Sequence, residues 1–128
     1  MIHGIGTDLC RIERVAAALG RHGDRFAERI LFDDERRRFL DAPDRARFLA
    51  MRFAAKEAFG KALGTGIRPP ATLHAVRVTQ NDLGRPGFSY AAPLAQYLRD
   101  RKLMAHLSLS DDAGFALAFV VIESEFNA

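Results

Sequence analysis

One long segment without helix breakers constrains this chain more than any other feature. Residues 44–63 contain no proline and a single glycine, and Pro43 suits the first turn of a helix. We therefore predict one long helix near the middle of the 128 residues. Short helices and strands on both sides of it are typical of an α+β fold, in which an antiparallel sheet packs against the long helix.

Apolar periodicity and turn residues predict the remaining elements. The last strand is apolar on both faces, so it should lie in the centre of the sheet. We find no repeat, linker or low-complexity segment, and we expect a single domain over residues 1–128. The expected helices are 9–19, 24–30, 33–41 and 93–102, and the expected strands are 2–7, 73–80, 87–90, 104–110 and 115–123.

Glu57 and Lys61 lie four residues apart on the long helix, so their side chains project from the same face. A Glu–Lys pair at this spacing is common on helix surfaces and contributes about 0.2–0.5 kcal/mol, which is the simplest interpretation of the pair alone. The alternative is a ligand site, because a carboxylate and an ammonium together can hold a metal ion and a phosphate. The following Gly64-Thr65-Gly66 segment lets a ligand approach the backbone closely.

Two further segments carry candidate site residues. Near the N-terminus, a short strand with two glycines ends at Asp8, where we expect the next helix to begin. Asp8 is also a favourable helix N-cap, which contributes about 1 kcal/mol without any function. In the strand 104–110, His106, Ser108 and Ser110 share one face, which is either open to water or a wall that hydrogen-bonds a ligand.

Taken together, these segments resemble a known family. The order and spacing are similar to those of the small bacterial 4'-phosphopantetheinyl transferases, the holo-[acyl-carrier-protein] synthase family, over residues 2–123. The resemblance implies the 4'-phosphopantetheinyl transferase fold, in a single domain that forms a homotrimer with its sites between neighbouring subunits. The segments that carry it are Gly4-Ile5-Gly6-Thr7-Asp8, Arg52-Phe53-Ala54-Ala55-Lys56-Glu57-Ala58 and His106-Leu107-Ser108-Leu109-Ser110.

The reaction that the resemblance implies is transfer of 4'-phosphopantetheine from coenzyme A to a serine of an apo acyl carrier protein, a step of fatty acid biosynthesis. Because the nucleophile belongs to the carrier, no nucleophile-and-base pair is needed in this chain. Mg²⁺ typically binds one or two carboxylates together with phosphate oxygens and waters. The resemblance assigns Asp8 and Glu57 to Mg²⁺ and Lys61 to a phosphate oxygen. The general base stays open between Glu57 and the acidic run Asp33-Asp34-Glu35.

Coenzyme A would contact several further residues by the same resemblance. Arg52 lies about 140° around the helix from Glu57 at 100° per residue, so it suits the 3'-phosphate of a coenzyme A bound by a neighbour. Arg45 and Arg47 are weaker candidates for that phosphate, and Arg85 is equally well explained as an exposed turn residue. The residues implied for the rest of the nucleotide pocket are Gly64, Thr65, Gly66, Arg85, Pro86, His106 and Ser108.

Arginines are concentrated in the first half of the chain, whose formal net charge is +3. Each one suits a solvated helix face, whereas the group suits an acidic protein or a polyphosphate. The resemblance implies that the acidic carrier protein docks on Arg14, Arg21, Arg25 and Arg29, where opposite charges raise the encounter rate.

Two alternatives of other classes stay open. A small basic RNA-binding module would explain the charge, but the sequence has no aromatic-rich strand for base stacking, so we expect no nucleic-acid partner. A structural trimer subunit with a vestigial site would keep the fold without the chemistry.

Composition agrees with a small cytoplasmic enzyme. An apolar fraction of 48% is enough for a compact core, and no apolar run reaches the roughly 18–20 residues of a membrane span. We therefore expect no membrane association. Asp8 and Arg11 interrupt any signal-peptide pattern, and the single Cys10, expected as a small buried residue on the first helix, suits a reducing compartment.

Two positions depart from the family pattern. Asp111 stands where the last motif usually has a histidine, so the nucleotide site differs there while the metal site is unaffected. Gly60 replaces a usual serine before Lys61, which lowers helix propensity by up to about 1 kcal/mol relative to Ala.

Overall fold

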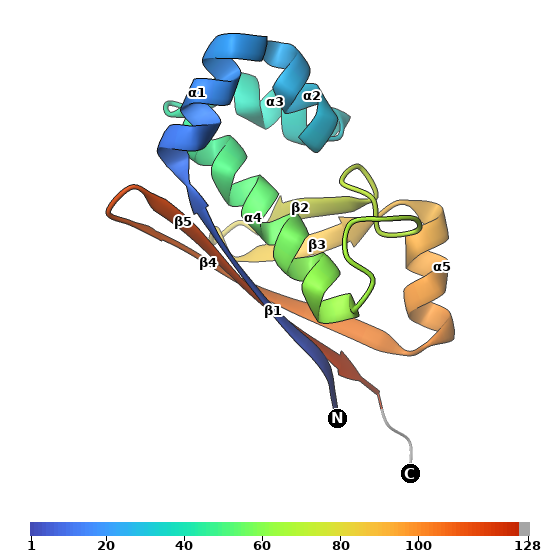
Figure 1. Cartoon of the computed structure of the whole chain (residues 1–128). Coiled ribbons are helices and arrows are strands. Elements are labelled where there is room, and N and C mark those ends of the chain that lie inside the picture. Colours follow the sequence, from blue (N-terminus) through green and yellow to red (C-terminus); the bar gives the residue numbers. More distant parts are fainter. Residues whose placement is uncertain (126–128) are drawn as a thin grey trace.

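The structure is a computed structural model that describes residues 1–125. It confirms the predicted α+β class, with a long helix lying across an antiparallel sheet (Figure 1). No helix within the described residues is both long and apolar enough to cross a membrane. The elements are β1 (Ile2–Arg11), α1 (Ile12–His22), α2 (Asp24–Ile30), α3 (Asp33–Asp41), α4 (Arg45–Leu63), β2 (Val76–Gln80), β3 (Pro86–Tyr90), α5 (Ala92–Asp100), β4 (Leu103–Asp112) and β5 (Phe115–Ser124).

Helix α4 packs against two antiparallel sheets. The larger has the order β1-β5-β4, and the smaller pairs β2 with β3. Strand β5 is central, as its two apolar faces predicted, and its inner residues Ala116, Ala118, Val120 and Ile122 are fully buried. Helices α1, α2 and α3 gather at one end of α4, and α5 lies near the other end (Figure 1).

Strand β1 lies directly on α4 because two of its inward residues are glycines. A Cβ atom at Gly4 would overlap the carbonyl oxygen of Ala62, and one at Gly6 would overlap that of Ala58. The small residues of α4 complete this close approach, since each alanine at the contact is buried. As a result, Asp8, which follows on the same face of β1, is brought against the helix.

The boundary between β1 and α1 differs from the prediction. The strand continues to Arg11, which pairs with Phe115, and α1 begins only at Ile12. Asp8 is therefore not a helix N-cap, and Cys10 lies in the strand, partly buried, instead of on the first helix. The ladder of backbone hydrogen bonds with β5 outweighs the helical periodicity that begins at Leu9.

Smaller boundary differences also have local causes. Helix α1 runs past Gly20 to His22 and is capped by Gly23, whose positive φ of 62° suits glycine. Helix α4 begins after Asp44, whose side chain accepts a hydrogen bond from the Arg47 backbone nitrogen. Strand β2 starts at Val76, three residues later than predicted, because the preceding segment forms a turn closed by Thr72.

The outer face of the three-stranded sheet is apolar in its centre. Leu9 of β1 is 62% exposed and Phe119 of β5 is 42% exposed, and Ile5 and Leu117 are also exposed. Adjacent to them on β4, the register places His106 and Ser108 opposite Val121 and Phe119. The chain thus leaves an apolar face, bordered by hydroxyls and an imidazole, uncovered by its described residues.

Candidate active site

The end of β1 and the last turns of α4 bring Asp8 and Lys61 into contact. The Lys61 ammonium donates a hydrogen bond to the Thr7 carbonyl oxygen at 2.9 Å and lies 3.3 Å from Oδ1 of Asp8. The Asp8 side chain is 18% exposed, whereas that of Lys61 is 54% exposed, so the pair opens toward solvent on the lysine side. Such a half-open ion pair can exchange partners when a charged ligand arrives.

Glu57 completes this group of charges one turn before Lys61. Partial burial raises the pKa of the Glu57 carboxyl, the nearby Asp8 carboxylate raises it further, and the Lys61 ammonium lowers it. Two carboxylates that repel each other form an environment that a divalent cation stabilises. Asp8 and Glu57 therefore form the part of the described chain whose charges best fit Mg²⁺.

The number of ligands is also consistent with Mg²⁺. Residues 1–125 contain no group of three or more His, Cys, Asp or Glu side chains arranged to hold a metal ion. A complete cage is not required, because Mg²⁺ keeps several waters and typically binds one or two carboxylates plus substrate phosphates. The two carboxylates therefore fit a cation whose coordination shell is completed by a phosphate-bearing substrate.

A glycine loop folds back on the end of α4 beside Lys61. The Gly60 carbonyl oxygen accepts hydrogen bonds from the backbone nitrogens of Gly64 and Gly66, both at 3.0 Å. A Cβ atom at Gly60 would lie 2.9 Å from the carbonyl carbon of Gly66, so the loop would have to move. This contact gives a structural reason for glycine at position 60, where the resemblance implied serine. Between Gly64 and Gly66, Thr65 donates a hydrogen bond from its hydroxyl to the Gly66 carbonyl oxygen.

Arg52 lies on another side of α4 and faces a different cavity. Its side chain is 3% exposed, and its Nε lies 3.8 Å from Glu35 Oε2. Neither Nε nor Nη2 has a hydrogen-bond partner among the described residues. Burial lowers the pKa of Arg52 to about 10, which leaves the guanidinium cationic at neutral pH. The cavity of about 340 Å³ is lined by Arg47, Phe48, Met51, Arg52, Gln80, Gly84, Pro86, Leu109 and Asp111.

The remaining nucleotide candidates are distributed over two places. Pro86 lines the Arg52 cavity. Arg85 precedes Pro86 in a turn, and its backbone forms hydrogen bonds with Asn81. His106 and Ser108 lie on the outer face of the sheet, as the period of two predicted, and His106 Nε2 lies 3.0 Å from Glu123 Oε1. Because Asp8 faces α4 on the inner side, a single chain does not bring these two residues to Asp8 and Lys61.

The chain is similar to known proteins along nearly its whole length. The family model described as 4'-phosphopantetheinyl transferase superfamily matches residues 4–120. The chain belongs to this superfamily. A holo-[acyl-carrier-protein] synthase of Azoarcus sp. is 59% identical over 124 residues, which cover 97% of this chain and 99% of the relative.

Solved structures of this transferase superfamily agree with the fold. A holo-[acyl-carrier-protein] synthase from Neisseria meningitidis is 41% identical, with a TM-score of 0.93 over 97% of this chain and 100% of its own. A synthase from Bacillus anthracis, crystallised in complex with CoA (3',5'-ADP), is 36% identical, with a TM-score of 0.82 over 98% of this chain and 99% of its own.

The arginines predicted to dock a carrier protein lie together only in part. Arg21, Arg25 and Arg29 line one hollow of about 290 Å³ between α1 and α2, together with His22 and Phe26. Arg14 is exposed on α1 and does not line that hollow. Three arginines that line one hollow form a basic surface that suits an acidic partner.

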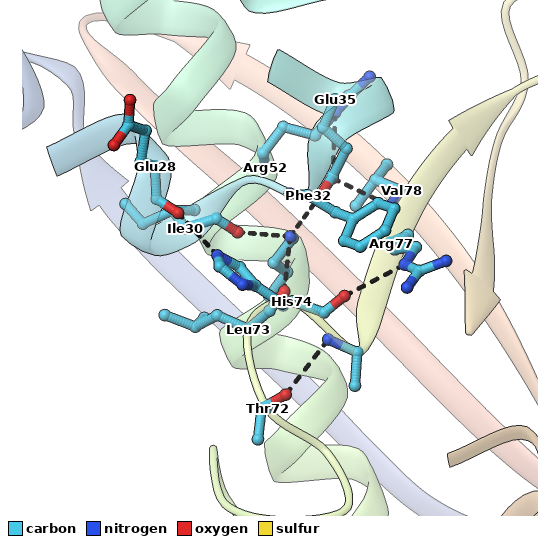
Figure 2. A network of polar contacts seen from close by, with 12 residues as sticks. Glu28, Ile30, Phe32, Glu35, Arg52, Thr72, Leu73, His74, Arg77 and Val78 are labelled. Atoms are coloured by element: carbon cyan, nitrogen blue, oxygen red, sulfur yellow. Dashed lines mark hydrogen bonds and ion pairs between the residues drawn. The ribbon is translucent and has the colours of Figure 1, made fainter. Parts of the chain in front are cut away.

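A buried ion pair beside Glu57 was not predicted from the sequence. Lys56 is fully buried, and its ammonium donates to Glu35 Oε1 at 2.6 Å and to the carbonyl oxygens of Ile30 at 2.6 Å and Leu73 at 2.7 Å. Figure 2 shows Ile30, Glu35 and Leu73 converging from three segments of the chain. Burial lowers the pKa of Lys56, which the Glu35 carboxylate opposes. The network joins the end of α2, the first turn of α3 and the segment before β2 to Lys56, the residue that precedes Glu57 on α4.

Asp111, which stands where the resemblance implied a histidine, pairs with Arg47. Arg47 donates from Nε to Oδ2 at 2.8 Å and from Nη2 to Oδ1 at 2.7 Å, a bidentate arrangement. The hydrogen bonds from Arg47 lower the pKa of Asp111, and those same bonds raise the pKa of Arg47. The pair joins the first turn of α4 to the end of β4, so the departure at Asp111 has a defined partner.

Proposed function

We propose that this chain transfers 4'-phosphopantetheine from coenzyme A to a serine of an apo acyl carrier protein. The products are the holo carrier and adenosine 3',5'-bisphosphate, and the reaction serves fatty acid biosynthesis in the cytoplasm. The observation that carries the proposal is the convergence of Asp8, Glu57 and Lys61 at the contact of β1 with α4. High identity to synthases along nearly the whole chain supports it.

Three side chains would act on the diphosphate of coenzyme A. Asp8 and Glu57 would hold Mg²⁺, which when bound neutralises charge on the phosphate oxygens. Lys61 lies at the open side of the site, where its ammonium would bind a phosphate oxygen of the leaving group. The glycine loop beside it keeps side chains away from the backbone that faces the substrate.

Glu57 is the best candidate for the proton acceptor in this site. Without a bound cation, its raised pKa makes it a stronger base than an ordinary glutamate, and a bound cation would lower that basicity. Glu35 is buried and bonded to Lys56, and it accepts hydrogen bonds from two backbone nitrogens as well. Asp33 and Asp34 pair with Arg36 and Arg37 on the surface of α3. Of the acidic residues considered from the sequence, only Glu57 lies beside Asp8.

We further propose a homotrimer of this transferase domain, residues 1–128, with its active sites between subunits. The exposed apolar face around Leu9 and Phe119 supports association through the sheet. His106 and Ser108 lie on that outer face, so they would contribute to coenzyme A binding only at a site shared with another chain. Light scattering tests this arrangement: the parent should have the mass of three chains, and Phe119→Glu should dissociate it. A parent that stays monomeric while transferring phosphopantetheine would overturn the shared site.

The carrier protein would dock on the basic hollow of α1 and α2. Arg21, Arg25 and Arg29 supply its charge, and Arg14 extends the basic surface along α1. An acidic helix of the carrier complements this surface, and attraction between them would raise the association rate.

Product analysis tests the reaction directly. The protein, coenzyme A, Mg²⁺ and an apo acyl carrier protein should yield adenosine 3',5'-bisphosphate in step with consumption of the apo carrier. Replacing the carrier's acceptor serine by alanine should abolish both. Formation of the nucleotide without any carrier would show hydrolysis of coenzyme A instead of transfer.

A further inference from the structure

The Arg47–Asp111 pair forms a wall that two cavities share. On one side lies the Arg52 cavity of about 340 Å³, and on the other lies a second cavity of about 570 Å³ that Arg11 and Asp44 also line. Both Arg47 and Asp111 contribute to the lining of each cavity. A change in this pair therefore alters the charge that faces the Arg52 cavity.

Arg52 has the properties of a side chain that binds an anion in that cavity. Its side chain is 3% exposed, its guanidinium carbon lies 4.4 Å from the centre of the Phe48 ring, and two of its nitrogens lack hydrogen-bond partners among the described residues. Glu35 is too distant for a hydrogen bond, since its Oε2 lies 3.8 Å from Nε. Buried donors without partners are costly, so an anion that accepts from them would be bound favourably.

Arg47 is the other cation on the lining of the Arg52 cavity, and its charge is already engaged. Its Nε–Nη2 edge, one of the edges that binds a phosphate in bidentate fashion, is occupied by both Asp111 oxygens. The Asp111 carboxylate also lines the cavity, where it repels an incoming phosphate. Both effects reduce the attraction of the cavity for an anion.

We propose that Asp111 withholds Arg47 from the Arg52 cavity, so that this chain binds the 3'-phosphate of its nucleotide with one free arginine instead of two. The inference rests on the proposed function, because it assigns the anion in the cavity to coenzyme A. Asp111 is then a residue that sets the affinity for the 3'-phosphate without contacting the reacting atoms.

Equilibrium binding of adenosine 3',5'-bisphosphate by calorimetry tests the inference. Asp111→Asn frees the Arg47 edge and removes the repelling charge, so it should bind the bisphosphate about three- to tenfold more tightly than the parent. Adenosine 5'-monophosphate, which lacks the 3'-phosphate, should show less than about a twofold change. The gain should disappear in the double variant Arg47→Gln/Asp111→Asn, because it lacks the second guanidinium and has the same net charge at these two positions as the parent.

The neighbouring Asp112 provides a matched control. It is exposed on the same strand, and it forms no ion pair with any residue in the range 1–125. Asp112→Asn changes the net charge equally without releasing Arg47, so its affinity for the bisphosphate should stay within about twofold of the parent. A gain of the same size in Asp112→Asn would reduce the effect to general charge and contradict the inference.

The remaining outcomes separate this inference from the proposed function. Equal or weaker binding by Asp111→Asn, with the parent binding normally, would overturn the inference alone. It would mean that Asp111 orients Arg47 for the nucleotide instead of withholding it. If the parent binds neither nucleotide and modifies no carrier, the proposed function fails, and the inference fails with it.

Discussion

The Lys61 ammonium lies 3.3 Å from the Asp8 carboxylate, although the two residues come from opposite sides of the contact between α4 and β1. Lys61 also holds the Thr7 carbonyl oxygen, so it fixes the strand residue that precedes Asp8. In the absence of a ligand, this lysine neutralises one carboxylate of the proposed metal pair. A bound cation would replace Lys61 beside the Asp8 carboxylate, and a phosphate would replace Asp8 beside the Lys61 ammonium. The exposed position of Lys61 leaves its ammonium accessible to that phosphate.

Removing either carboxylate should abolish most of the transfer. We expect Asp8→Asn and Glu57→Gln each to lower kcat/KM by about 10²–10³-fold, because the metal loses a ligand at the site of developing charge. Initial rates of holo-carrier formation measure this. Asp82→Asn, an exposed turn residue, serves as the matched control and should keep the parent rate.

Thermal unfolding separates this loss from misfolding. The folded state raises the pKa of Glu57, so the ionised side chain costs stability at neutral pH, and the cost is lost as pH falls through the raised pKa. Glu57→Gln should therefore melt at the same temperature as the parent or higher. Normal turnover in both carboxylate variants would contradict the metal assignment.

The pH dependence should carry the signature of Glu57. Since its pKa lies above the ordinary glutamate value, the ionised form is lost at a higher pH than for an exposed glutamate. The acidic limb of kcat/KM should thus lie above the usual glutamate range at limiting Mg²⁺. Saturating Mg²⁺ favours the ionised form and should move the limb to lower pH. An acidic limb that does not respond to Mg²⁺ would exclude Glu57 as its origin.

Lys56 should matter for stability more than its place in the sequence suggests. Lys56→Met removes the charge that compensates buried Glu35 and leaves two carbonyl oxygens without their donor. We expect a loss of about 3–5 kcal/mol in the free energy of unfolding by urea, as for other broken buried ion pairs. Lys102→Met, at an exposed position, should change it by less than about 0.5 kcal/mol. Equal effects of the two substitutions would show that the buried network contributes little.

Much of the fold follows from local pattern. The segment without breakers became α4, and the strand that is apolar on both faces became the central β5. The start of α1 could not be predicted, because pairing of β1 with β5 extends to Arg11 and outweighs a helical period. Long-range pairing of this kind is not encoded in the residues around Asp8 alone.

The site was predictable only in its residue types. The contact of Asp8 with Lys61 depends on Gly4 and Gly6, whose lack of side chains lets β1 lie on α4. Lys56 was missed because lysines are almost always exposed. A signal was present, since Lys56 lies in helical phase with Arg52 and the buried Phe59, which places two cations on an apolar stripe.

Charge reversal on the proposed docking surface should affect one substrate only. Arg25→Glu should raise KM for the apo carrier about tenfold or more, because a repulsive contact replaces an attractive one, and it should leave the dissociation constant of coenzyme A unchanged. Arg99→Glu on α5, outside the basic hollow, makes the same charge change and should leave both values near those of the parent. Equal loss of carrier and coenzyme A binding in Arg25→Glu would count against docking at this surface.

The most direct measurement is the intact mass of an apo acyl carrier protein after incubation with this chain, coenzyme A and Mg²⁺. We predict a gain of one phosphopantetheine group, absent when EDTA removes the metal and absent with Glu57→Gln. An unchanged carrier mass, with a cognate carrier and a folded protein, would contradict the proposed transfer.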